Sequence, residues 1–372
     1  MMATINERLR DEVISHRVDL TRYEAGVVSK LVATLSADDS ELAARLLVAL
    51  EDIPAGSLSV KKLSRLLAPV RDINRKAVTR FFGELGQVLK DFTEYEAGFG
   101  FDLMKSLLPE VVSQRGLLKK IDAGQAYVRA VTEPFHGYTL KDWTDKLEAD
   151  RFARIVNTVR TGLGSGETPE QITRSVRGTK ARNWQDGALN KSRANASAIG
   201  YSALGHTAEI VREQTATAND HLIRAKQWLS TLDNKTSPPC RIRDALQYTL
   251  DNKPIKHGIP WGDGPGRLHF HCRSTYTLIF KSWQDMGLLP DDLTAAEKEK
   301  MNGEVPAAST YPEWISRQRA SRQDDILGPA RGKLLRSGGL RLTSFYTEDG
   351  RWLTLDELRQ RDAAAFRRTG LN

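Results

Sequence analysis

The N-terminal half of the chain has the hydrophobic spacing of amphipathic helices. Apolar residues recur every three or four positions from Leu9 to Leu31, again from Leu42 to Ile53, and in a longer stripe from Val78 to Phe99. This spacing places apolar side chains along one face of a helix. It predicts three helices whose apolar faces form a core or contact one another, and the second helix is expected to end near Pro54.

Turn signals separate these helical stretches. The segments Pro134-Phe-His-Gly137 and Gly162-Leu-Gly-Ser-Gly166 combine residue types that favour turns. After the second of them, Thr168-Pro-Glu-Gln171 predicts a helix start, with Thr168 as the N-cap and Gln171 completing a capping box. A further helix start is predicted at Thr354-Leu-Asp-Glu357.

The pattern changes after about Ala225. Residues 228–280 lack helical periodicity and hold several prolines and glycines, while residues 274–280 have the composition of a strand. The predicted fold is therefore mainly α, with an elongated helical N-terminal part, a small α+β module and a C-terminal extension. We place these parts at residues 1–160, 161–285 and 286–372.

Composition narrows the class of protein. The chain has 372 residues, of which 40% are hydrophobic, an ordinary content for a globular protein. It contains no apolar run of the roughly 18 residues that a membrane span needs, so no membrane association is expected. The charged first residues do not resemble a signal peptide. We therefore expect a reducing compartment, which disfavours a disulfide between Cys240 and Cys272, the two cysteines.

The net charge of +8 is concentrated in one segment. Residues 172–281 hold 17 Lys and Arg against 8 Asp and Glu, whereas residues 1–171 and 283–372 are close to balanced. Such a segment can contact nucleic acid through phosphate groups. A basic surface that serves solubility, or one that binds an acidic protein, explains the same excess.

The strongest chemical signal is a group of cysteine and histidine residues. Thiolates and imidazoles are the ligands that zinc prefers, and a metal crosslink can stabilise a small, loop-rich module. The spacing predicts a zinc site, with Asp233 and His257 in reserve for a missing ligand. The predicted metal ligands are Cys240 and Cys272 with one or both of His269 and His271, which gives three or four ligands.

Other interpretations of these residues stay open. They could be two buried free thiols, a disulfide that forms late, or histidines that only form hydrogen bonds. The sequence has no HExxH motif, deaminase signature, Walker A loop or nucleophile elbow, so catalysis is the minority interpretation. Next to Cys240, the residues Trp228, Asp233 and Thr236 predict a structural turn with the tryptophan ring packed beneath it.

Two of these segments together are characteristic. Trp228-Leu-Ser-Thr-Leu-Asp-Asn-Lys-Thr-Ser-Pro-Pro-Cys240, followed by His269-Phe-His-Cys-Arg-Ser274, resembles the phage Mu F-like head morphogenesis family. Ala245 stands where this family often has glycine, which leaves the loop conformation there open. Further similarity extends to residues 95–97, 134–137, 192–195 and, for a subgroup of the family, 311–358.

The resemblance implies a minor head protein in the virion of a tailed phage, present in several copies, and not an enzyme. Its implied partners are the portal protein, the major capsid protein and double-stranded DNA, bound without sequence preference. Its implied location is the capsid interior at the portal vertex, after assembly in the host cytoplasm. The predicted DNA contacts are Arg241, Arg243, Lys256, Arg267 and Arg273.

Two other functions remain in competition. The first is a metal-dependent nuclease or hydrolase built on Cys240, His269, His271 and Cys272. The second is a free DNA-binding regulator, which is the weaker alternative because the chain has no recognisable helix-turn-helix or zinc-finger spacing.

Overall fold

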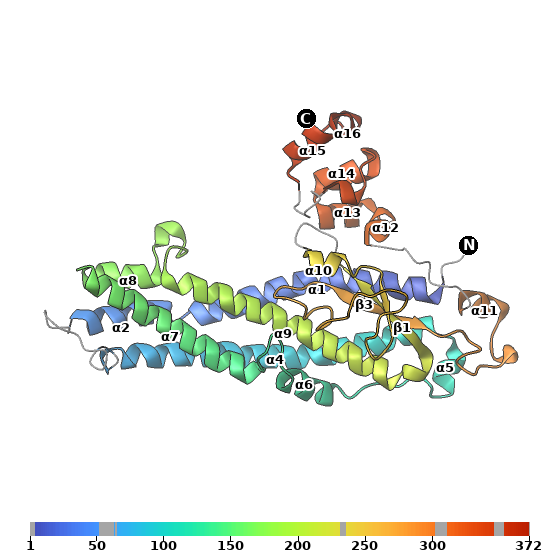
Figure 1. The fold of residues 1–372 in the computed structure, drawn as a ribbon, viewed down its shortest axis with the longest axis horizontal. Helices are drawn as coiled ribbons and strands as arrows, with labels where there is room; N and C mark the ends of the chain where they lie inside the picture. Colours follow the sequence, from blue (N-terminus) through green and yellow to red (C-terminus); the bar gives the residue numbers. More distant parts are fainter. Residues whose placement is uncertain are drawn as a thin grey trace. The chain divides into compact units, whose positions relative to one another are not determined.

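The computed structural model describes residues 4–51, 63, 65–230, 236–301, 311–345 and 353–371 (Figure 1). The chain divides into two compact units that interleave along the sequence. Unit 1 comprises Met1–Arg22, Tyr95–Ala126 and Ala208–Asn372, and unit 2 comprises Tyr23–Glu94 and Tyr127–Thr207. The consecutive ranges 1–160, 161–285 and 286–372 do not follow this division, because three long helices each contribute residues to both units.

The fold is mainly α, as the hydrophobic spacing predicts. Each of the three predicted N-terminal helices is present: α1 (Ile5–Ser36), α2 (Asp39–Glu51) and α4 (Ala68–Leu107). Among the described residues before Ile223, further helices are α5 (Glu110–Gln114), α6 (Ala123–Thr132), α7 (Leu140–Gly164), α8 (Pro169–Arg177), α9 (Ala188–Ala218) and the short η1 (Lys180–Arg182) and η2 (Asp220–Leu222).

The second apolar stripe contributes to the core of unit 2 as expected. Leu42 and Leu46 of α2 are buried against residues of α7 and α8, among them Ile155 and Ile172. Tyr23 is an exception in the first stripe, because 42% of its surface is exposed. A buried ion pair between Arg151 of α7 and Asp39 of α2 joins these two helices. Asn74 accepts a hydrogen bond of 2.9 Å from the same arginine.

Local signals in the sequence fix the ends of several elements in unit 2. Thr168 caps α8, and Gln171 completes the capping box, as predicted. The turn predicted at 134–137 is a tight hairpin in which Phe135 and Tyr138 exchange backbone hydrogen bonds. His136 and Gly137 both have positive φ, which is the conformation that a two-residue hairpin loop requires.

Unit 1 contains a three-stranded antiparallel sheet. The strands are β1 (Ile223–Leu229), β2 (Gln247–Tyr248) and β3 (Thr275–Phe280), in the order β2-β1-β3. Every residue of β3 is buried, which explains why this strand has a continuous apolar and hydroxyl composition instead of strict alternation. The predicted strand at 274–280 is therefore confirmed.

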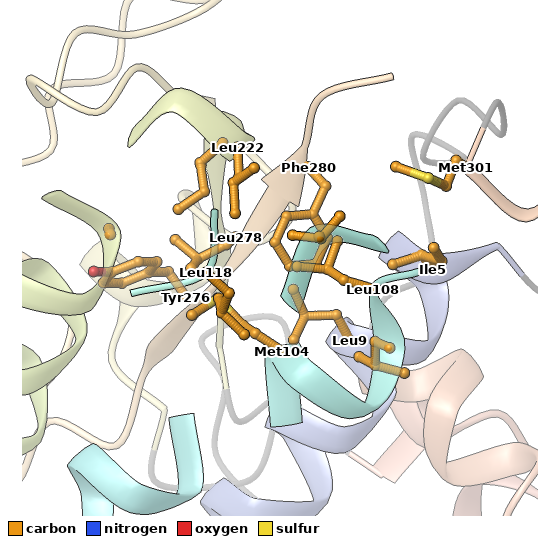
Figure 2. Packing of buried hydrophobic residues seen from close by; sticks show 14 of the residues in the cluster. Ile5, Leu9, Met104, Leu108, Leu118, Leu222, Tyr276, Leu278, Phe280 and Met301 are labelled. Atoms are coloured by element: carbon orange, nitrogen blue, oxygen red, sulfur yellow. The ribbon is translucent and has the colours of Figure 1, made fainter. Parts of the chain in front are cut away.

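One face of β3 packs on two helices. Figure 2 shows Leu278 and Phe280 of β3 close to Leu9 of α1, to Met104 of α4 and to Leu108, which directly follows α4. Burying these apolar surfaces stabilises the folded state by about 25 cal/mol per Å². The α1 and α4 segments of unit 1 therefore pack against the sheet and stabilise it.

The C-terminal part of unit 1 consists of short helices. Leu327, Leu334 and Phe366 belong to a core cluster that also includes Val18 of α1 and Leu229 of β1. The predicted capping box at Thr354 and Glu357 is present. The elements are η3 (Pro290–Asp292), α11 (Ala295–Met301), α12 (Tyr311–Ser316), α13 (Ala320–Leu327), α14 (Pro329–Ser337), η4 (Leu342–Phe345), α15 (Leu355–Arg361) and α16 (Ala363–Thr369).

No helix among the described residues has both the length and the apolar composition needed to cross a membrane.

Candidate metal centre

Two short elements of unit 1 bring the predicted metal ligands together. Cys240 lies on α10 (Pro238–Arg241), a single helical turn. His269 and Cys272 lie on a tight turn that leads into β3, closed by a hydrogen bond of 3.1 Å from the amide of Cys272 to the carbonyl of His269. Ser230, just after β1, donates its hydroxyl to the carbonyl of Cys240 over 2.7 Å. Because β1 pairs with β3, this bond helps to hold α10 beside the turn.

Three potential ligand atoms converge at this point. The Sγ atoms of Cys240 and Cys272 are 3.6 Å apart, and Cys240 Sγ is 3.2 Å from Nε2 of His269. All three atoms lie within 4.8 Å of one another. Two thiolates bound to zinc at about 2.3 Å in tetrahedral geometry stand roughly 3.8 Å apart. The donor set and its spacing therefore fit a metal ion.

The ring of His269 is oriented as a metal ligand would be. Its Nδ1 lies 2.8 Å from the carbonyl of Phe270. Donation of the Nδ1 proton to that carbonyl leaves Nε2 facing the two thiols. A backbone carbonyl that holds the second ring nitrogen is the usual arrangement around metal-binding histidines. The hydroxyl of Ser237 is 2.7 Å from Nε2, so this serine also borders the site.

The two thiols differ in acidity. The hydrogen bond between them raises the pKa of Cys240 and lowers the pKa of Cys272 below its usual value. The contact with Cys272 raises the pKa of His269. Binding of a metal ion would require the proton of Cys240 to leave, so its affinity would increase with pH.

Two of the other predicted ligands lie outside this group. His271 is exposed, with φ of +59°. His257 uses its ring elsewhere, because Nε2 lies 2.8 Å from the carbonyl of Gln247 and Nδ1 accepts from the amide of Ile259. Of the three or four predicted ligands, the described residues bring together Cys240, His269 and Cys272 and leave out His271. Asp233, the other reserve ligand, lies outside the described residues.

The predicted structural turn is only partly described. Thr236 is half-buried, and Asp233 lies outside the described residues. Trp228 is fully buried, but it lies within β1, where its Nε1 donates to the hydroxyl of Ser230 over 3.1 Å. Its ring meets Trp261 edge to face, 5.1 Å between centroids. In the described residues, the Trp228 side chain therefore fills the hydrophobic core beside the sheet. The turn motif alone had predicted only that it packs beneath the turn.

Sequence reasoning missed the polar residues that support the site. Asp244 accepts a hydrogen bond of 2.8 Å from the amide of Ser230, and burial raises the pKa of this carboxyl to about 6. Serine and aspartate are common in loops, and no spacing marked these two. Ala245, where the resembled family often has glycine, has φ of +63°. The loop therefore has the backbone conformation that glycine adopts most easily.

The five predicted DNA contacts differ in their exposure to solvent. Arg243 is buried and donates to the carbonyls of Pro239 and Pro260 at 2.6 and 3.0 Å. Arg267 is paired with Glu213 and is 14% exposed. Because both guanidinium groups are used inside the module, we correct the prediction for these two residues. The other three candidates keep more exposure: Lys256 is exposed, and Arg241 and Arg273 are half-buried.

Comparison with known proteins gives no match, whether by family model, curated protein or solved structure.

Proposed function

We propose that this protein is a minor head protein of a tailed bacteriophage, located at the portal vertex and active in head assembly and in DNA packaging or delivery. The observation that supports the proposal is the meeting of the two halves of the characteristic sequence pattern. Cys240 ends the first half and His269 and Cys272 lie in the second, and their ligand atoms are within 4.8 Å of one another.

In this proposal the bound metal is a structural zinc ion. Two sulfur ligands and one imidazole form a donor set that zinc prefers. The ion would join α10 to the turn before β3 and so stabilise a sheet with only three strands. Cys240, His269 and Cys272 would hold it, with Ser230 and Phe270 fixing two of these ligands through their hydrogen bonds.

One observation favours a second candidate, a metal-dependent hydrolase. The described residues supply three ligands, and three protein ligands with one open position are typical of catalytic zinc. Replacing His269 by alanine separates the two functions. A catalytic site would lose metal-dependent turnover, whereas a structural site would show a lower melting temperature and no turnover to lose.

The proposed location and partners have a direct test. Purified virions should contain the protein in several copies, and the protein should co-purify with a portal oligomer and contact the major capsid protein. Immunoblots of virions and of empty heads, together with a pull-down on portal protein, would measure this. A virion that lacks the protein would overturn the proposal, because a minor head protein is retained in the particle.

Metal content is measured separately. Elemental analysis of protein purified without added metal should give close to one zinc ion per chain. The variant Cys240→Ser should lose most of it. A zinc content near zero in a wild-type protein that still associates with the portal would remove the zinc from the proposal and keep the assembly role.

A further inference from the structure

Part of the excess of Lys and Arg in the basic segment lies in unit 2, away from the metal site in the sequence. Residues 171–193 contain six Lys and Arg and one acidic residue, Asp186, which is more than half of the excess in the basic segment. They form the end of α8, the turn η1 and the first turn of α9, here called the basic corner. In Figure 1 the light green segment between α8 and α9 projects away from both helices.

The basic corner is built as a defined structure. The amide and hydroxyl of Thr179 donate to the carboxylate of Asp186 at 2.7 and 2.8 Å. Gly178 ends α8 with φ of +93°, and a Cβ at Gly187 would overlap the backbone of Arg177. This close approach requires glycine, so the loop is fixed against the end of α8.

Most of its cations are directed to solvent. Arg174, Lys180, Arg182 and Lys191 are all exposed. The single acid, Asp186, already accepts the two hydrogen bonds from Thr179, and these bonds lower its pKa. Like charges held together within a Debye length of about 8–10 Å produce a positive potential that attracts a polyanion.

The aromatic residue of the corner indicates which form of nucleic acid fits. The guanidinium of Arg177 lies 4.1 Å from the centroid of the Trp184 ring and covers one of its faces. Proteins that bind single strands offer open aromatic faces on which bases stack. Trp184 is half-buried as well. The corner therefore presents charge without a free stacking platform, which suits the phosphate backbone of a duplex.

We propose that the basic corner binds the phosphate backbone of double-stranded DNA without reading its sequence. This rests on the proposed function, since it names the surface that meets the packaged genome. It also moves the main DNA contact to unit 2 from the metal module, meaning residues 236–280 around the metal site, where Arg243 and Arg267 are used internally.

The test compares three triple variants of the full chain on a random-sequence duplex of about 30 base pairs. Each neutralises three cations by substitution with glutamine. The corner variant changes Arg174, Lys180 and Arg182. The control changes Arg75, Lys141 and Lys146, solvent-accessible cations of the same unit that are each paired with an aspartate. The module variant changes Arg241, Lys256 and Arg273.

Fluorescence anisotropy between about 50 and 300 mM NaCl gives the salt dependence of the affinity. The logarithmic slope falls by about 0.9 for each phosphate contact that a substitution removes, so the corner variant should lose about 2.7 from the slope and the control less than about 1. Substitutions of exposed residues change stability little. Because Arg241 and Arg273 are half-buried, thermal melting would verify the fold of each variant.

Each outcome has a distinct meaning. If the wild type binds and the slope falls for the module variant instead of the corner variant, the corner does not bind the duplex and the proposed function stands. If the wild type binds poly-glutamate but not DNA, the surface meets an acidic protein and the inference is wrong. If the wild type binds no duplex at any salt concentration, the DNA role in the proposed function fails along with the inference.

Discussion

Glu209 is a buried carboxyl group that accepts no hydrogen bond from the described part of the chain. It lies on α9 in unit 1 and is 1% exposed, and neither carboxylate oxygen has a hydrogen-bond partner there. The nearest cations, Arg212 and Arg267, are 3.8 and 3.9 Å away. Burial raises the pKa of Glu209 to about 8, and the two arginines only partly oppose that effect. Glu213, Lys226 and Tyr276 are the other titratable groups that act on it.

Replacing Glu209 by glutamine should therefore stabilise the protein at high pH. The folded state keeps the proton of Glu209 up to about pH 8, whereas the unfolded chain loses it near 4.5. Between these values the folded state binds more protons, so wild-type stability falls by about 1.4 kcal/mol per pH unit as pH rises. Glutamine does not ionise, so the variant does not lose this stability as pH rises. The variant should match the wild type near pH 4.5 and exceed it by on the order of 3–5 kcal/mol at about pH 8.5.

Urea denaturation at a series of pH values measures this difference. The matched control is Glu96→Gln, a second buried glutamate of unit 1 whose carboxylate lies 2.6 Å from His16 Nε2 and 3.5 Å from Arg212. Because glutamine cannot replace the carboxylate in its contacts with His16 and Arg212, that variant should be destabilised by about 1–3 kcal/mol at pH 7. If Glu209→Gln is also destabilised, by an amount that does not vary with pH, then Glu209 is ionised and stabilised by its arginines.

Three further predictions concern the metal site, a cavity and a helix cap. Cys272→Ser should release the metal, whereas His271→Ala should retain it, as measured by elemental analysis, because only Cys272 belongs to the converging group; equal losses would contradict the three-residue site. Gly100→Ala should raise the free energy of unfolding by about 1 kcal/mol through helix propensity, plus a few tenths from partly filling an apolar cavity of about 50 Å³. Gly98→Ala, in the same helix with open space around it, should give the propensity gain alone, and equal gains would show that the cavity is not filled. Thr168→Ala should cost about 1 kcal/mol, since it removes the N-cap of α8; an unchanged urea midpoint would show that the cap contributes nothing.

Only the tertiary structure could identify the ionisable residues that are buried. Glu209 and Arg267 look like surface residues in the sequence, as most charged residues are. Their burial follows from the packing of α9 and the 254–272 loop on the sheet, which involves segments far apart in the chain. The same holds for His271 and Cys272, adjacent in sequence, because the turn before β3 directs one to solvent and the other to Cys240.

The sequence by itself determined three N-terminal helices, the caps at Thr168 and Thr354, and the cysteine–histidine group. Helix formation depends on contacts three and four residues apart and on side chains at the helix ends, so Thr168 and the stripe from Val78 to Phe99 carry that information locally. The tertiary structure decided which three ligands converge, because a ligand set depends on distances across 32 residues of chain. It also separated the exposed cations of the basic corner from those used inside the metal module, since net charge along the chain does not reveal which side chains reach solvent.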